Sequence, residues 1–393
     1  MSETKKRWLT LIISVLLTLV AIECILHLFE TQTYVSIWRI NKDGMAVLKP
    51  NLDRNLFDNE ELKYFHVKSN SLGFLGDDFS EEKASGTLRI VVLGDSYVEA
   101  TGVDYNRTFV YQLSKKFQDL LFTNPSSTYN KVEVLNFGIG GTGTVDQMKY
   151  YEKYAQKYHP DVVVLAFYLQ NDATDNSYSY KYKDAMLASK ESWNTFPQYA
   201  STQINNFVSV KDRIYRMSAI IRFFDRIVRG SPVLYDFAVK FGLYRPPAKG
   251  ENGLVIPYDD YYYITPLDEQ RSKYLQFSID LLDNLKKQLD KDGVKFALMF
   301  IPQGMTVDKN VLNSYLDQYP GLKNVDFNPK AFEDRLIAGL DPSIKMINLR
   351  ETMEKEVSDG KEMYKNGWGH FSQGGHDVVS DVLAKFIFDS FYK

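Results

Sequence analysis

Runs of hydrophobic residues alternate with amphipathic segments over most of the chain after residue 87. The longest runs read LRIVVL at 88–93, VVVLAF at 162–167 and KFALMFI at 295–301. Strands that are hydrophobic without alternation are buried on both faces, as in parallel sheets covered by helices. The pattern therefore predicts an α/β fold, a three-layer α/β/α sandwich with a central parallel sheet. Two weaker strands are expected at 132–136 and 345–349, and helices at about 107–122, 145–158, 267–291, 328–340 and 373–392.

A separate apolar run occupies residues 8–29. As a helix it would be about 33 Å long, enough to cross the hydrocarbon core of a bilayer. Lys5, Lys6 and Arg7 precede it and no basic residue follows immediately, so the N-terminus is expected in the cytoplasm. A cleaved signal peptide is the alternative, but residues 24–34 lack a clear small-x-small cleavage site. We therefore expect an uncleaved, single-pass anchor in the plasma (inner) membrane, with the rest of the chain periplasmic or extracellular.

Changes in composition divide the chain into four predicted parts. They are a cytoplasmic tail (1–7), a transmembrane anchor (8–29), an extracytoplasmic lead-in (30–86) and a main domain (87–393). The lead-in is rich in Asn, Asp and Gly and is expected to form short strands and turns. Within the main domain, the segment at about 174–262 interrupts the alternation of strands and helices. Its helical stretch carries several arginines among Ile, Phe and Leu, which indicates either a lid or membrane-surface element, or a helical insertion with a solvated basic face.

Composition excludes several classes of function. The formal net charge is −3, so nucleic acid is not an expected partner. Cys24 is the only cysteine, so the chain has neither an intrachain disulfide nor a cysteine metal site. It follows Glu23 rather than the small residue of a lipoprotein signal, and Glu23 and His27 are expected to reach the interface or a partner helix. No metal or other cofactor is predicted, since His370 and His376 lack carboxylates in register for a metal site.

Four residues at the ends of predicted strands, or before the last helix, carry candidate chemistry. Ser96 ends the segment Leu-Gly-Asp-Ser at 93–96, where a strand-to-helix turn surrounds a nucleophile with backbone N–H donors. Gly141 lies in a glycine-rich turn after the second strand and can present an unobstructed N–H to an oxyanion. Asn171 follows the third strand and offers a side-chain amide donor. His370 precedes the closing helix, where it can take a proton from the serine and return it to a leaving group.

This order of residues resembles the SGNH/GDSL hydrolase family, in its membrane-anchored bacterial type. The resemblance covers about residues 68–176 and 266–390, and the lead-in segment NSLGF at 70–74 shares it. It implies the SGNH hydrolase-like, flavodoxin-like form of the α/β/α sandwich. By analogy the site consists of Ser96 as nucleophile, His370 as general base, the oxyanion-hole donors Ser96, Gly141 and Asn171, and the supporting residues Asp95 and Asp172.

Two positions depart from the family's pattern. Leu169 stands where the asparagine block usually has glycine, which changes the backbone locally but leaves the amide. The family's last block reads Asp-x-x-His, whereas Gly367 stands three residues before His370. Three accounts remain open: a Ser-His dyad oriented by a backbone carbonyl, a substitute such as Glu362 or the neutral Asn366, or a degenerate site. We adopt the dyad, because an orienting acid contributes up to about 10⁴-fold in rate and its loss leaves an enzyme, though a slower one.

The pattern as a whole predicts a serine esterase outside the cytoplasm. Its substrate would be a glycan or lipid that carries acyl groups, O-acetyl groups first among them, and its mechanism would pass through a Ser-His acyl-enzyme. An O-acyltransferase acting on a polysaccharide would use the same intermediate, with a sugar in place of water as acceptor. A non-catalytic glycan-binding or assembly protein is the third hypothesis, motivated by the missing acid and the aromatic-rich insertion. Oligomeric state is not predicted.

Overall fold

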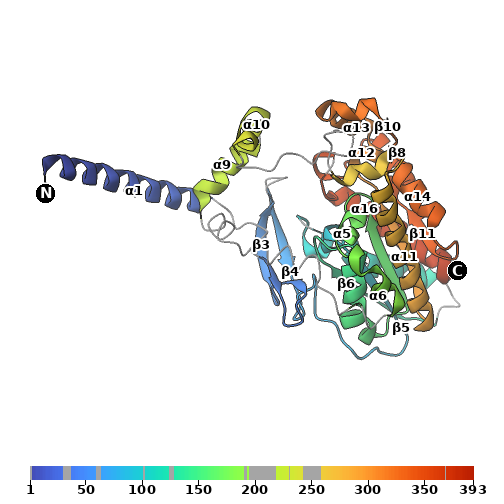
Figure 1. The fold of residues 1–393 in the computed structure, drawn as a ribbon. Coiled ribbons are helices and arrows are strands. Elements are labelled where there is room, and N and C mark those ends of the chain that lie inside the picture. The colour runs from blue at the N-terminus through green and yellow to red at the C-terminus, as the bar shows by residue number, and fades with distance from the viewer. Residues whose placement is uncertain are drawn as a thin grey trace. The chain divides into compact units, whose positions relative to one another are not determined.

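The fold was examined in a computed structural model, shown in Figure 1. It describes residues 2–29, 37–58, 63–100, 102–123, 128–189, 193, 218–229, 231–241, 258–367 and 369–393. The chain divides into two compact units, one formed by residues 1–36 and 203–247 and the other by residues 37–202 and 248–393.

The smaller unit contains α1 (Glu3–Phe29), α9 (Ala219–Arg229) and α10 (Pro232–Lys240). The stretch Glu3–Leu26 has a mean hydropathy of 2.7 in its most apolar window, and none of that window is buried. Its length and composition suit a membrane anchor or a signal sequence. The helices α9 and α10 fall within the helical stretch that was expected in the insertion. Much of the rest of that insertion, including residues 194–217, lies outside the described residues.

The larger unit is built on a five-stranded sheet whose paired strands are all parallel, in the order β11-β9-β7-β5-β6. β5 lies between β6 and β7. The predicted central parallel sheet is confirmed, and each predicted strand agrees to within two residues at either end. The bounds are β5 (Thr87–Gly94), β6 (Lys131–Gly138), β7 (Val162–Tyr168), β9 (Lys295–Ile301) and β11 (Lys345–Asn348).

Helices cover both faces of the sheet, as Figure 1 shows for α11 and α16. On one face, Ile90 and Val92 of β5 pack with Phe109, Leu113 and other residues of α3 and with the closing helix α16. On the other face α4, α5 and α11 pack together, and α11 contacts β9. Among its described residues, this unit contains the α-helices α2 (Ser96–Glu99), α3 (Phe109–Thr123), α4 (Thr144–Tyr150), α5 (Asp172–Ser177), α6 (Lys183–Ala188), α11 (Glu269–Lys291), α12 (Gly304–Val307), α13 (Lys309–Gln318), α14 (Ala331–Gly339), α15 (Arg350–Ser358) and α16 (Gln373–Phe391).

Two antiparallel hairpins precede the sheet and belong to the same compact unit. They pair β1 (Trp38–Ile40) with β2 (Ala46–Leu48), and β3 (Asp53–Asp58) with β4 (Lys63–Lys68). The turn after β4 is organised by Asn70, whose Oδ1 accepts hydrogen bonds from the N–H groups of Leu72 and Phe74. The short strands and turns expected in the lead-in are therefore present. A further two-stranded pair joins β8 (Ile264–Thr265) to β10 (Asp326–Phe327).

Several helices differ from the prediction for local reasons. α3 begins at Phe109, because the Thr108 hydroxyl accepts a hydrogen bond from the N–H of Tyr111. The helix expected at 145–158 starts as α4 and continues through a π-turn and a 3-10 turn to Tyr158. The helices α13 and α15 were not predicted. Each buries only one or two side chains, so neither carries the apolar stripe by which a helix is recognised in a sequence.

Candidate active site

Ser96 stands at a sharp turn between a buried strand and a short helix. All of β5 is buried, and Asp95 then caps α2 by accepting a hydrogen bond at Oδ1 from the N–H of Tyr97, at 2.9 Å. A Cβ on Gly94 would lie 2.3 Å from Cγ2 of Val98, so the turn requires glycine at the end of the strand. Ser96 itself is partly exposed between buried neighbours. The turn therefore presents the serine hydroxyl at the carboxyl edge of the sheet.

His370 reaches Ser96 from the other end of the chain. Its Nε2 lies 2.8 Å from the Ser96 Oγ, within hydrogen-bond distance. The Tyr97 hydroxyl donates to the carbonyl oxygen of Gly369 at 3.0 Å, and the N–H of Lys365 donates to the carbonyl of His370 at 2.9 Å. These bonds fix the loop on both sides of the imidazole. The structure thus brings together the two residues to which the sequence assigned the nucleophile and the general base.

The environment of His370 favours a neutral imidazole. Burial and, to a smaller extent, the positive charge of Lys365 lower the pKa of His370 to about 4, although the negative charge of Asp58 opposes them in part. Lys365 and Asp58 form a buried ion pair, with 2.6 Å between Nζ and Oδ2. At neutral pH the ring is therefore uncharged and able to accept a proton.

The structure explains why no acidic residue stands at position 367, three residues before His370. Gly367 has a φ of +82°, a conformation that L side chains rarely adopt, and a Cβ there would lie 2.6 Å from Cγ2 of Val311. Glu362 and Asn366, the substitutes considered from the sequence, are both exposed. Among the described residues no carboxylate forms a hydrogen bond with the His370 ring. Trp368, the neighbour of Gly367, lies outside the described residues.

The glycine-rich turn after β6 lies directly beside the serine. A Cβ built on Gly140 would be 3.5 Å from the Ser96 Cβ, and the Gly140 N–H donates to Oε2 of Glu99 at 2.6 Å. Gly141 has a φ of +72°, is exposed, and has no heavy atom within 4 Å of its Cβ position. The space beside the α-carbon of Gly141 is therefore open, one residue after the glycine that adjoins Ser96.

Asn171 follows β7 at the same carboxyl edge and is partly buried. Its Nδ2 donates to Oδ2 of Asp175 at 3.0 Å, which leaves the second N–H of that amide for another acceptor. Burial raises the pKa of Asp175 well above its usual range, and the negative charge of Asp259 adds to the effect. The Asn171 side chain is thus held in place by a residue of α5, the helix that it precedes.

Asp95 and Asp172, the two supporting residues expected from the sequence, are completely buried. Asp172 accepts a hydrogen bond at Oδ2 from the N–H of Tyr168 at 2.9 Å, at the end of β7. Burial raises the pKa of Asp95 to about 7 and that of Asp172 well above its usual range, and the proximity of Asp95 raises the latter further. Each carboxyl therefore fixes the backbone of one turn, the first after β5 and the second after β7.

Glu99 and Trp38 were not recognised in the sequence as parts of the site. The Trp38 indole N–H donates to Oε2 of Glu99 at 3.0 Å, the same oxygen that accepts from Gly140. A Cβ on Gly140 would also lie 3.2 Å from the Trp38 ring, so this ring packs against the glycine turn that adjoins Ser96. The position of Glu99, three residues after the nucleophile on a short helix, was the available signal. Trp38 comes from β1, and no local pattern indicated it.

His376 has a structural setting. It is buried, and its Nδ1 accepts a hydrogen bond from the N–H of Phe109 at 3.1 Å, at the start of α3. Its ring stacks on the Phe109 ring, with 5.8 Å between centroids. Burial lowers the pKa of His376 to about 3. The two histidines of the last block therefore differ in their contacts, since only His370 contacts the serine.

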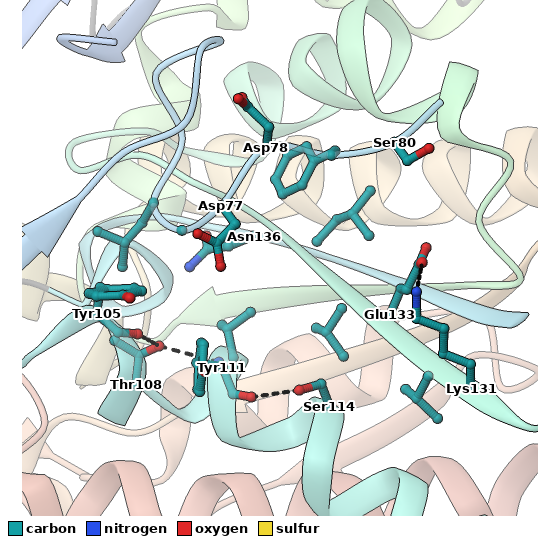
Figure 2. Close-up of a pocket in the computed structure, with 17 residues that line it drawn as sticks. Asp77, Asp78, Ser80, Tyr105, Thr108, Tyr111, Ser114, Lys131, Glu133 and Asn136 are labelled. Atoms are coloured by element: carbon teal, nitrogen blue, oxygen red, sulfur yellow. Dashed lines mark hydrogen bonds and ion pairs between the residues drawn. The ribbon is translucent and has the colours of Figure 1, made fainter. Parts of the chain in front are cut away.

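A cavity of about 460 Å³ lies elsewhere in the larger unit (Figure 2). It is bounded by the loop after β4, by α3 and by the edge strand β6, with Tyr105, Tyr111, Asp77 and Asp78 among its lining residues. Neither Ser96 nor His370 lines it. This cavity is therefore separate from the candidate active site.

Comparison with known proteins gives one family match. The model of the GDSL-like lipase/acylhydrolase family matches residues 90–383. No match was found among curated proteins.

Three of the solved structures that are similar to this chain have low sequence identity to it. A lipolytic protein of the G-D-S-L family from Desulfitobacterium hafniense DCB-2 is 9% identical, with a TM-score of 0.35, over 76% of this chain and 98% of that chain. The lipase/acylhydrolase from Enterococcus faecalis is 14% identical, with a TM-score of 0.36, over 76% of this chain and 95% of that chain. A catalytic mutant of an acetylxylan esterase from Geobacillus stearothermophilus is 10% identical, with a TM-score of 0.36, over 79% of this chain and 97% of that chain.

Proposed function

The chain belongs to the GDSL-like lipase/acylhydrolase family, and from this premise we propose that it is a serine esterase in which Ser96 and His370 act as a dyad. Membership of the family makes it an ester-cleaving hydrolase. The observation that carries the proposed mechanism is the 2.8 Å distance between His370 Nε2 and Ser96 Oγ. It supports direct proton transfer between the two groups.

In the proposed reaction His370 accepts the Ser96 proton while Oγ attacks the carbonyl carbon of the ester. The tetrahedral intermediate collapses, the imidazolium protonates the departing alcohol, and the acyl group stays on Oγ. Water then attacks the acyl-enzyme, His370 takes one proton from it, and that proton returns to Ser96 as the carboxylic acid leaves. The lowered pKa of His370 is compatible with its role as base, because the ring is neutral at neutral pH before acylation and again before deacylation.

The negative charge of the intermediate needs hydrogen-bond donors beside Ser96. We assign this oxyanion hole to the N–H groups of Ser96 and Gly141 and to the side-chain amide of Asn171. The open surroundings of Gly141 and the hydrogen bond that orients the Asn171 amide support the assignment. Asp95 and Asp172 would support it indirectly, by fixing the two turns that carry Ser96 and Asn171.

A dyad accounts for His370 better than a triad does. The left-handed backbone at Gly367 and its contact with Val311 leave no room there for the side chain that the family usually carries. The loop contacts made by Tyr97 and Lys365 hold the backbone on both sides of His370 and would limit the positions of its ring. We therefore expect orientation by the loop in place of an orienting carboxylate.

We further propose that the enzyme works outside the cytoplasm on an acylated glycan or lipid, with O-acetyl groups as the first candidates. The basic residues 5–7, followed by the apolar helix α1, support an anchor with the N-terminus inside. In this arrangement residues 1–7 form the cytoplasmic tail, residues 8–29 the anchor, residues 30–86 the lead-in and residues 87–393 the catalytic domain with its insertion. The Trp38 ring, which packs against the glycine turn that adjoins Ser96, is compatible with a small acyl group.

The proposal is tested by hydrolysis of p-nitrophenyl acetate and of acetylated polysaccharide, measured with the wild type and with Ser96→Ala. Acetate release by the wild type alone is the expected result. A folded wild type that releases no acetate from any ester would contradict the proposal. Adding free glycan acceptors during turnover separates hydrolysis from transfer, since a transferase would move the acetyl group to the sugar in place of water.

A further inference from the structure

Glu23 of α1 joins the apolar helix to the start of α9 within the smaller unit. Its carboxylate accepts hydrogen bonds from the Ser218 hydroxyl at 3.0 Å and from the N–H groups of Ala219 at 2.5 Å and Ile220 at 3.2 Å. The first N–H groups of a helix have no partner within the helix, and a carboxylate there also interacts favourably with the helix dipole. Glu23 therefore caps α9 from a distant part of the sequence, and Figure 1 shows α9 meeting the C-terminal end of α1.

The sequence of α9 has two contrasting faces. With 3.6 residues per turn, Ile220, Phe223, Phe224 and Ile227 fall on one side of the helix. The arginine positions 222, 226 and 229 fall on the opposite side. A short helix with an aromatic and aliphatic face and a basic face is typical of segments that lie in the membrane interface.

The apolar side chains of this helix pair are exposed. Phe224 of α9 and Phe237 of α10 each keep 59% of their surface accessible, and Val233 keeps 77%. The rings of Phe237 and Phe241 pack against each other, with 4.6 Å between centroids, and so extend the apolar surface along α10. A cluster of exposed aromatic side chains of this kind indicates a surface that binds a membrane or another protein.

We propose that α9 and α10 lie in the interface of the bilayer that α1 spans, with the Phe224 and Phe237 side chains in the lipid. The inference rests on the proposed membrane anchor. Lipid is the expected occupant because Glu23 lies three residues before Leu26, the end of the apolar stretch, so the start of α9 is held at the edge of the span. The arginine positions opposite the apolar face suit contact with anionic headgroups. These helices then form a second membrane contact of the chain.

The experiment uses the full-length protein in vesicles of phosphatidylcholine and phosphatidylglycerol, with brominated acyl chains as quencher. In a Cys24→Ala background, one fluorescent label is attached through Phe224→Cys, Phe237→Cys, Leu16→Cys or Tyr111→Cys. Leu16 reports insertion of α1, and the exposed Tyr111 of the larger unit is the aqueous control. Circular dichroism of each labelled protein shows whether it is folded.

Quenching by brominated lipid at Leu16, Phe224 and Phe237, without quenching at Tyr111, is the expected result. If the label at Leu16 is quenched but the labels at Phe224 and Phe237 are not, the inference is overturned and the membrane anchor is still supported. No quenching at any position would overturn both. Labels at Phe224 and Phe237 that are shielded from aqueous iodide but not reached by brominated lipid would show that a protein covers this face, and would also overturn the proposal.

Discussion

The Asp58 carboxylate and the Lys365 ammonium form a buried ion pair, and both charges act on the imidazole of His370. Asp58 ends β3 of the second hairpin, far from the catalytic loop in sequence. The hairpin therefore contributes to the electrostatics of the candidate base as well as to packing. Lys365 lowers the pKa of the His370 imidazole and Asp58 raises it. Replacing one or the other should therefore shift this pKa in opposite directions.

The first prediction concerns the effect of Asp58 and Lys365 on the pKa of His370. Asp58→Asn removes the negative charge that raises the pKa of His370 and should shift the acid limb of kcat/KM to lower pH, whereas Lys365→Met removes the positive charge that lowers this pKa and should shift the limb to higher pH. Each single substitution should also lower the free energy of unfolding by about 3–5 kcal/mol, because it breaks a buried ion pair by removing one partner. The double variant Asp58→Asn/Lys365→Met should recover part of that stability. Acid limbs that do not move in opposite directions would show that the pair serves packing alone.

The second prediction is the position of the acid limb in the wild type. His370 acts as a base only when neutral, and its pKa is lowered to about 4. As the pH falls from neutrality, kcat/KM for p-nitrophenyl acetate should therefore stay constant and drop by half only near pH 4. A limb close to 6.5, the ordinary value for histidine, would mean that the ring is more hydrated, or better paired with an acid, than the structure indicates.

The third prediction concerns the oxyanion hole. Asn171→Ala removes one proposed donor and should lower kcat by about 10²–10³-fold with little effect on folding. Gln170→Ala is the matched control, because its side chain accepts a hydrogen bond from the Tyr168 hydroxyl and has no assigned role in the reaction. Equal kcat values for the two variants would remove Asn171 from the mechanism. Steady-state kinetics with p-nitrophenyl acetate provide the comparison.

The fourth prediction separates the two histidines of the last block. His376→Ala leaves the buried N–H of Phe109 without its acceptor and should lower the free energy of unfolding by about 1–3 kcal/mol. His376→Asn can supply an oxygen to that N–H and should lose less. Denaturant unfolding gives both values, and reaction of Ser96 with a fluorophosphonate should persist in each folded variant. Loss of that reaction in a folded His376→Asn protein would contradict a purely structural role.

The same histidine gives a pH dependence of stability. The folded protein keeps His376 neutral until about pH 3, whereas the unfolded chain binds a proton near 6.5. The unfolded state therefore gains protons first, and the free energy of unfolding should fall as the pH drops through this range. His376→Asn has no titrating group at this position, so its loss of stability with falling pH should be less steep.

Much of the fold was predictable because the strands are buried on both faces. The strand β7 is hydrophobic throughout, β9 is hydrophobic after Lys295, and β5 is hydrophobic over most of its length despite Arg89. A parallel sheet follows from such runs when helices separate them. Ser96, Gly141 and Asn171 could be proposed from the sequence because each follows a strand, and the carboxyl ends of parallel strands gather at one edge of the sheet. His370 could be proposed from its place before the closing helix.

The rest depended on contacts between distant residues. Trp38 and Asp58 lie in hairpins whose sequence shows only short strands and turns, and nothing local indicates that they pack near Ser96 and His370. The backbone at Gly367 is left-handed because of its surroundings, so the sequence showed a missing acid but not the contact with Val311 that excludes it. Glu23 was recognised as a polar residue in an apolar helix, but its partner α9 lies almost two hundred residues away.

The most direct test of the Ser96–His370 dyad is covalent labelling of the folded protein with a fluorophosphonate, followed by mass analysis of the modified peptide. The account predicts a single adduct on Ser96, none in Ser96→Ala, and much slower labelling in His370→Ala. An adduct that persists in Ser96→Ala would contradict it. So would a folded wild-type protein that neither reacts with the probe nor turns over p-nitrophenyl acetate.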